Sequence, residues 1–126
     1  MENALIIGAS GGIGTALMQA LTARGVAVTG LSRSEHGLDV TDEASVRAAL
    51  EPLAGPYDLI FVATGALEIQ GATPEKSLKE LNAQAMLNQF ALNSVGPSLV
   101  LKHSVRLLPR DRRAVFAALS ARVGSI

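Results

Sequence analysis

Short apolar runs alternate with amphipathic stretches along this chain of 126 residues. Continuous apolar or β-branched runs predict buried strands, whereas apolar residues three or four positions apart predict one face of a helix. The strands predicted in this way cover residues 4–7, 26–31, 37–40, 59–63 and 114–119. The runs at 4–7 and 26–31 are interpreted as buried strands, the one at 37–40 as a very short strand, and the run at 59–63 is expected to be buried on both faces. The strand at 114–119 is expected to be an edge whose apolar residues lack cover unless further strands follow it. This alternation predicts an α/β fold with a parallel sheet and right-handed crossovers.

Three helices are predicted between the strands: residues 13–23, 43 to about 50, and 73 to about 108. The first ends at Arg24-Gly25, a cation followed by a glycine. The second follows Thr41-Asp42-Glu43, which offers capping side chains and acids for the first turn. The third begins with a cap and a proline at Thr73-Pro74-Glu75, and Gly96-Pro97 predicts an interruption within it.

Four glycines stand where the first strand gives way to the first helix, in Gly8-Ala9-Ser10-Gly11-Gly12-Ile13-Gly14. Gly8 allows a sharp turn, while Gly12 and Gly14 leave room for a pyrophosphate and for close packing of helix and strand. A helix N-terminus there would offer free N–H groups to a phosphate. A Walker-type loop does not fit, because no lysine occurs before Lys76. A glycine-rich turn without a ligand is the alternative interpretation.

In such folds ligands gather at the carboxyl ends of the strands. Ser32 and Arg33 follow the second strand, where a hydroxyl and a guanidinium suit the 2′-phosphate of NADP; an ordinary surface arginine is the alternative. Asp39-Val40 is expected to cover the adenine, unless Asp39 caps the next helix. The small residues Ala63-Thr64-Gly65 either admit a flat ligand or form a tight turn.

Two further polar residues are candidates for chemistry. Asn93 lies within an apolar helical stretch, and Ser120 follows the last strand, where its hydroxyl could hold a carbonyl substrate. Each also has a structural interpretation. Asn93 would be exposed or hydrogen-bonded in a helix kink, and Ser120 would be a cap or turn residue. His36 and His103 are isolated and show no metal-ligand spacing, so no metal site is predicted.

The amino-acid composition narrows the class of protein. Lys plus Arg and Asp plus Glu number 11 each, so no basic field is present to attract nucleic acid or an anionic membrane. The apolar fraction of 48% excludes intrinsic disorder. The absence of cysteine is compatible with a reducing cytosol, and no run reaches the ~20 apolar residues of a membrane span. We therefore expect one cytoplasmic domain over residues 1–126.

Taken together, the motifs resemble the short-chain dehydrogenase/reductase family, in particular its C-factor-like bacterial members. Residues 8–14 are similar to the family's Gly-x3-Gly-x-Gly cofactor loop, and Asp39-Val40 to its adenine-contacting pair. Residues 62–65 fall where the family has Asn-Asn-Ala-Gly, and Asn93-Ser94-Val95-Gly96 is similar to its Asn-x-x-Gly. The resemblance implies a Rossmann-type, doubly wound NAD(P)-binding domain with strand order 3-2-1-4-5, whose later strands are missing.

The resemblance also implies roles for individual residues. Asn93 would hold a water of a proton relay. The place of the family's catalytic serine falls on Ala121, so Ser120 or Ser125 would replace it, and Ser120 is our candidate. With NADP preferred to NAD, the expected cofactor-binding residues are Gly8, Ser10, Gly11, Gly12, Ile13, Gly14, Ser32, Arg33, Asp39, Val40, Ala63, Thr64 and Gly65.

The family's acid/base pair is a tyrosine followed four positions later by a lysine, whose charge favours the tyrosinate. The single tyrosine, Tyr57, has no lysine at position 61. We therefore expect these residues alone to bind a nucleotide at best and to catalyse no turnover. We also expect the chain to be either a portion of a longer protein or a truncated product.

Two functions follow as hypotheses. The first is the cofactor-binding portion of an oxidoreductase that transfers hydride between NADP(H) and a carbonyl or alcohol substrate. The second is a non-catalytic dinucleotide-binding sensor or scaffold module. A third possibility is an α/β fold that binds no nucleotide. The resemblance further implies a homo-oligomer formed through the long helix at residues 82–108.

Overall fold

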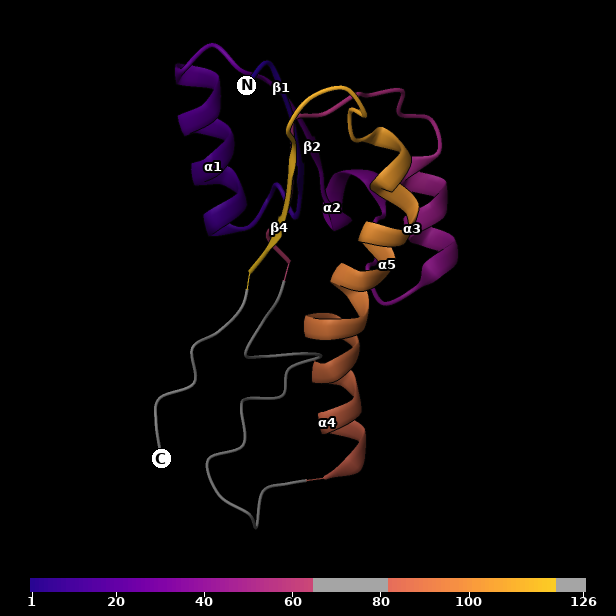
Figure 1. Cartoon of the computed structure of the whole chain (residues 1–126). Helices are drawn as coiled ribbons and strands as arrows, with labels where there is room; N and C mark the ends of the chain where they lie inside the picture. The colour runs from indigo at the N-terminus through magenta and orange to yellow at the C-terminus, as the bar shows by residue number, and fades with distance from the viewer. Residues whose placement is uncertain (65–81, 120–126) are drawn as a thin grey trace, which may run out of the picture.

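The computed structural model describes residues 1–64 and 82–119. One parallel sheet has the strand order β2-β1-β3-β4 (Figure 1). Its strands are β1 (Asn3–Ile7), β2 (Ala27–Leu31), β3 (Leu59–Val62) and β4 (Val115–Ala118). The helices are α1 (Gly12–Ala23), α2 (Arg33–His36), α3 (Glu43–Leu50), α4 (Ala83–Phe90) and α5 (Gly96–Ser104). A π-helical turn, η2 (Ala91–Val95), joins α4 to α5, and a 3-10 turn, η3 (Val105–Leu107), follows α5.

The sheet is covered on both faces, as the doubly wound interpretation predicts. Figure 1 shows α1 on one side of the sheet and α3 with α5 on the other. The register places Leu5 beside Ile60 and Ile7 beside Val62. These four side chains are fully buried, in one cluster with Val46 and Leu50 of α3 and with Val100 and Leu107. Burial of each such side chain contributes roughly 1.5–3 kcal/mol, so this face holds the main core.

Residues 37–40 do not form the predicted strand, so the described sheet has four strands instead of five. The segment uses its backbone groups elsewhere. The N–H of Asp39 donates to Ser45 Oγ at 2.9 Å, and the Ser45 hydroxyl donates to the Gly37 carbonyl oxygen at 3.0 Å. The Leu38 N–H points to the Ser32 carbonyl oxygen at 3.4 Å. Because these bonds tie the segment to α3 and to the end of β2, it forms no ladder with β2.

Burial of two strands also differs from the prediction. In β2 only Leu31 is buried and Ala27 is exposed, since no described strand pairs with its outer edge. In β3, Ile60 and Val62 are buried but Leu59 and Phe61 are half-buried. In the described part, α1 packs on β1 and β2 rather than over β3, so one face of β3 is less covered.

Helices α1 and α3, the first two that the sequence predicts, begin and end close to the predicted residues. Helix α1 ends at Ala23, with Arg24 as the C-cap and Gly25 at a φ of +80°. Helix α3 begins behind Asp42, whose carboxylate accepts the Ala44 N–H at 3.1 Å, and ends at Leu50. Both predictions are confirmed.

The helix predicted from residue 73 to about 108 is interrupted one turn earlier than predicted, between α4 and α5. The Gly96 N–H donates to the carbonyl of Ala91, five residues back, which makes residues 91–95 a π turn. Pro97 has no N–H to continue an α-helical ladder, so the wider turn precedes it. The cap predicted at Thr73-Pro74-Glu75 lies outside the described residues. Across residues 1–64 and 82–119, no helix has the length and apolar character that a bilayer span needs.

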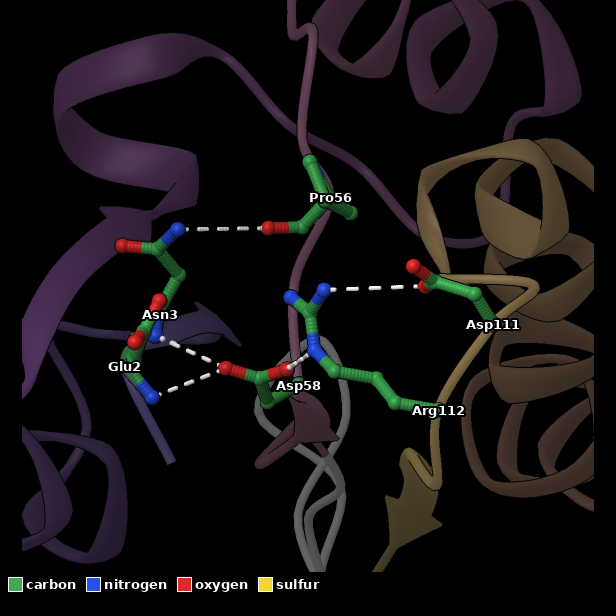
Figure 2. Close-up of polar contacts among 6 residues, drawn as sticks. All are labelled: Glu2, Asn3, Pro56, Asp58, Asp111 and Arg112. Carbon is green, nitrogen blue, oxygen red and sulfur yellow. Dashed lines mark hydrogen bonds and ion pairs between the residues drawn. The ribbon is translucent and has the colours of Figure 1, made fainter.

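Asp58 ties together the amino ends of the sheet (Figure 2). One carboxylate oxygen accepts the N–H groups of Glu2 and Asn3 at 2.8 and 3.2 Å, and the other accepts Arg112 Nε at 2.7 Å. The Glu2 N–H, the Arg112 guanidinium and the Asn3 N–H lower the pKa of the Asp58 carboxyl from 3.8 to about 2. A carboxylate that is only 8% exposed thus links β1 and β3 to the segment that enters β4.

Replacing Asp58 with Asn should lower the midpoint of urea unfolding, because the amide carries no charge for Arg112 and has one acceptor oxygen for three donors. The folded-state pKa of Asp58 lies below the unfolded one, so its contribution is present above 3.8 and disappears as the pH falls through about 2. The difference in midpoint between wild type and D58N should therefore shrink as the pH falls from about 7 to about 2.

The matched control is D111N, because Asp111 Oδ1 lies 3.8 Å from Arg112 and its side chain is 85% exposed. This variant should unfold at the wild-type midpoint. A difference between D58N and wild type that is independent of pH would contradict the assigned role of the Asp58 charge.

Candidate nucleotide-binding site

The glycine turn leaves β1 at Gly8, whose φ is +89°. The N–H groups of Gly8 and Ala9 both donate to the Leu31 carbonyl oxygen, at 2.8 and 3.0 Å, so the turn is tied to the end of β2. A Cβ at Gly8 would lie 3.0 Å from atoms of Ala63 and Thr64 at the end of β3. The positive φ and the close contact both require glycine here.

Gly14 and Gly12 differ in their surroundings. A Cβ on Gly14 would lie 2.0 Å from the carbonyl oxygen of Gly8, so only glycine lets α1 start against the end of β1. A Cβ on Gly12 would meet no atom of the described protein within 4 Å. The packing role predicted for glycine in this turn is confirmed at Gly14, and the ligand-facing role predicted for Gly12 stays a prediction.

The first turn of α1 presents its N–H groups without capping side chains. Its N-cap, Gly11, offers no side-chain acceptor. The N–H groups of Gly12, Ile13 and Gly14 find no acceptor within the described parts of the chain, as is usual for the start of a helix. Ser10 is exposed beside them. This end of the helix is therefore open to an anion.

Thr64 provides an independent polar group at this edge of the sheet. Its Oγ1 is buried and has no hydrogen-bond partner in the described structure. A buried hydroxyl without a partner costs about 1–3 kcal/mol, which a polar ligand atom could recover. Ala63, the residue before it, donates its N–H to the Ile7 carbonyl oxygen at 2.7 Å. Gly65, the third residue predicted here, lies outside the described residues.

Ser32 and Arg33, the two residues at the end of β2 that were predicted to bind the 2′-phosphate, differ in their exposure. Ser32 is 2% exposed, and its hydroxyl accepts the Glu35 N–H at 3.1 Å, so it is the N-cap of α2. Arg33 is the first residue of α2 and is exposed. Of the two, Arg33 has the accessible side chain.

Asp39 does not cap a helix, so that alternative is wrong. Its Oδ1 accepts the Thr41 hydroxyl at 2.6 Å and the Thr41 N–H at 2.9 Å, while Asp42 caps α3. The Thr41 hydroxyl, then its N–H and the charge of Arg33, hold the pKa of the Asp39 carboxyl below its usual value. The carboxylate is thus charged and fixed in orientation near Arg33.

Val40 faces the core and connects the segment that holds Asp39 to the start of helix α5. It is 3% exposed, and a Cβ on Gly96 would lie 2.8 Å from Val40 Cγ2. Asn93, three residues before Gly96, is exposed in the middle of the π turn η2. Such turns are frequent at functional sites. Ser120, the other residue predicted to be catalytic, lies outside the described residues.

A hollow of about 400 Å³ lies at the opposite, amino-terminal edge of the sheet. It is lined by Met1, Glu2, Asp58, Arg112, Arg113, Ala114 and Val115. Because parallel sheets bind ligands at the carboxyl ends of their strands, this hollow is not the candidate cofactor site. Within the described residues, no three His, Asp or Glu side chains gather as a metal site would need.

Solved structures define the class of fold. The chain is similar to a protein described as a short-chain alcohol dehydrogenase from Burkholderia multivorans, with a TM-score of 0.81 and 23% identity over 96% of this chain and 63% of that one. It is similar to a small-chain dehydrogenase, with a TM-score of 0.77 and 25% identity over 93% and 58% of the two chains. A short-chain dehydrogenase/reductase from Burkholderia multivorans with NADP bound gives a TM-score of 0.76 and 20% identity over 95% and 58%.

The fold is therefore that of the short-chain dehydrogenases/reductases, and the chain spans between 58% and 63% of the length of these three proteins. The sequence model of the NAD dependent epimerase/dehydratase family matches residues 4–98, and the chain belongs to this family. No curated protein matches the sequence. The family resemblance drawn from the motifs is confirmed, while its C-factor-like detail stays a prediction.

The two glycines of α1 allow a test of the geometry. Gly14→Ala should destabilise the fold by about 1–3 kcal/mol, because its methyl group would overlap the Gly8 carbonyl oxygen. Gly12→Ala should leave stability unchanged or raise it by up to about 1 kcal/mol, because alanine restricts the unfolded chain more than glycine does. Urea unfolding of both variants measures the difference. Equal stabilities for G14A and G12A would contradict the packing assigned to Gly14.

Proposed function

We propose that this chain is the cofactor-binding portion of an NADP-dependent oxidoreductase that transfers hydride between NADP(H) and a carbonyl or alcohol substrate. The observation that carries the proposal is the start of α1 at the carboxyl ends of β1, β2 and β3, where the N-cap Gly11 and the helix residues Gly12 and Gly14 have no side chain and the first N–H groups have no acceptor in the described structure. Family membership supports it, as do solved neighbours with NADP or NADPH bound.

In this proposal the diphosphate lies over the start of α1. The N–H groups of Gly12, Ile13 and Gly14 donate to its oxygens, and the positive end of the helix dipole stabilises its charge. Ser10 and Gly11 line the same turn, and Gly8 lets the chain enter it. When bound, the nicotinamide ring would donate or accept the hydride, while the protein fixes its position and excludes water.

The two ends of the dinucleotide would then contact different strand ends. Arg33 is the proposed partner of the 2′-phosphate, since a guanidinium matches phosphate geometry, and this is the basis for preferring NADP to NAD. Asp39 and Val40 lie on the adenine side. The unpartnered Thr64 hydroxyl, with Ala63, faces the other half of the cofactor, toward the nicotinamide.

Asn93 and Ser120 are the proposed catalytic residues, Asn93 by holding a water of the proton relay and Ser120 by binding the carbonyl oxygen. Tyr57 does not suit the role of acid/base. It is 8% exposed and sits at the amino end of β3, with its N–H bonded to the Leu107 carbonyl oxygen at 2.7 Å. The alternative function, a dinucleotide-binding sensor or scaffold, is favoured if the whole protein binds NADPH without turning over any carbonyl or alcohol.

We further propose a homo-oligomer through the helical segment 82–108. Its exposed apolar side chains support the proposal: Met86, Leu87, Phe90, Val95, Leu101 and Val105. Light scattering should give a mass above that of one chain, and a monomer mass would contradict it. The cytoplasmic location expected from the sequence stays a prediction.

Titration with NADPH tests the proposed function. Wild type should bind, and Gly12→Ala should bind about tenfold more weakly, about 1.4 kcal/mol, because its methyl group would stand between the helix N–H groups and the phosphate oxygens. Since G12A should fold as well as wild type, weaker binding would report on the site and not on stability.

The control is Thr22→Ala, an exposed position in the last turn of α1, which should bind as wild type does. Wild type that binds no NADPH, or G12A that binds it equally well, would contradict the placement of the diphosphate.

A further inference from the structure

His36 carries a role that its isolated place in the sequence does not indicate. Its ring Nδ1 lies 3.0 Å from the backbone nitrogen of Ser32, four residues earlier. A backbone N–H can only donate, so Nδ1 is the acceptor and carries no proton. The side chain of the last residue of α2 therefore reaches back and closes on the residue that precedes the helix.

This contact gives the backbone N–H of Ser32 a hydrogen-bond acceptor. Ser32 is 2% exposed, and a buried backbone N–H requires an acceptor. The Leu31 carbonyl, which belongs to the same peptide unit, points toward β1 and accepts the N–H groups of Gly8 and Ala9, so the Ser32 N–H points the opposite way, to the edge of β2 that no described strand pairs. His36 supplies the acceptor for Ser32 from the side chain of α2 instead.

Helix α2 is one turn long, too short to be stable by itself. Several contacts hold it: the His36 N–H donates to the Ser32 carbonyl oxygen at 3.0 Å, the Ser32 hydroxyl accepts the Glu35 N–H at 3.1 Å, the His36 ring accepts the Ser32 N–H, and Gly37 closes the C-terminus at a φ of +65°. The Gly37 N–H donates to the Arg33 carbonyl oxygen at 3.0 Å. The backbone of Arg33 is thus fixed from both sides, and the His36 ring is one of the fixing groups.

We propose that His36 is a positioning residue for Arg33, and that it thereby sets the preference for a dinucleotide with a 2′-phosphate over one without. The inference rests on the proposed function, because Arg33 selects between the two only if a dinucleotide binds. Loss of the His36 acceptor would free the single turn of α2 and spread the Arg33 guanidinium over more positions. Affinity for the 2′-phosphate would fall, and the contacts at the start of α1 would not change.

The test compares dissociation constants of NADPH and NADH for wild type, His36→Ala and His36→Asn. H36A should lower the preference for NADPH by about fivefold, the size of a typical coupling between neighbouring residues. H36N should keep the preference, since its Oδ1 can stand where Nδ1 accepts the Ser32 N–H. In an R33A background, H36A should leave the ratio of the two constants unchanged, because the effect acts through Arg33.

Amide hydrogen exchange of Ser32 in the free protein provides a readout without nucleotide. Exchange should be faster in H36A than in wild type and should stay slow in H36N. If wild type prefers NADPH and H36A keeps that preference, or loses both nucleotides equally, the inference is wrong and the proposed function stands. If wild type binds neither nucleotide, the proposed function fails and the inference fails with it.

Discussion

The approach of α1 to the end of β1 is the constraint on which the rest of the structure depends. The backbone of Gly14 passes so near the Gly8 carbonyl oxygen that a methyl group there would lie 2.0 Å from it. This contact fixes where α1 begins. The Gly8 N–H is bonded to the Leu31 carbonyl oxygen, and Thr64 packs against the same glycine. Three strand ends therefore meet one helix start, in a space that a side chain at Gly8 or Gly14 would occupy.

The amino-terminal edge of the sheet holds a buried carboxylate that is fully bonded, whereas the carboxyl-terminal edge includes polar groups without a partner among the described residues. At the amino-terminal edge, both oxygens of the buried Asp58 are bonded, and its pKa is lowered to about 2. At the carboxyl-terminal edge, the first N–H groups of α1 and the Thr64 hydroxyl have no partner in the described structure. Satisfied polar groups stabilise the fold, whereas unsatisfied ones retain free energy that a ligand can recover. This contrast supports the proposal that the carboxyl-terminal edge is the one that binds the ligand.

Local signals in the sequence predicted most of the fold, and contacts between distant residues explain the rest. The Asp42 cap of α3 and the Gly25 end of α1 act within a few residues, so the sequence was sufficient for them. The strand expected at 37–40 fails because Ser45, in a later helix, takes its hydrogen bonds. Of the candidate site, the glycine turn was predictable from spacing. The close contact of Gly96 with the segment before α3, and the bond from His36 to the β2 end, depend on a fold that no spacing reveals.

Nuclear magnetic resonance of the nitrogen-15-labelled protein during titration with NADPH tests the central claim most directly, because it reports on each backbone N–H separately. The account predicts that the amide signals of Gly12, Ile13 and Gly14 move most and saturate together, as phosphate oxygens accept their hydrogen bonds. Signals that move instead around Asp58 and Arg112, with those of the helix start unchanged at saturation, would contradict it.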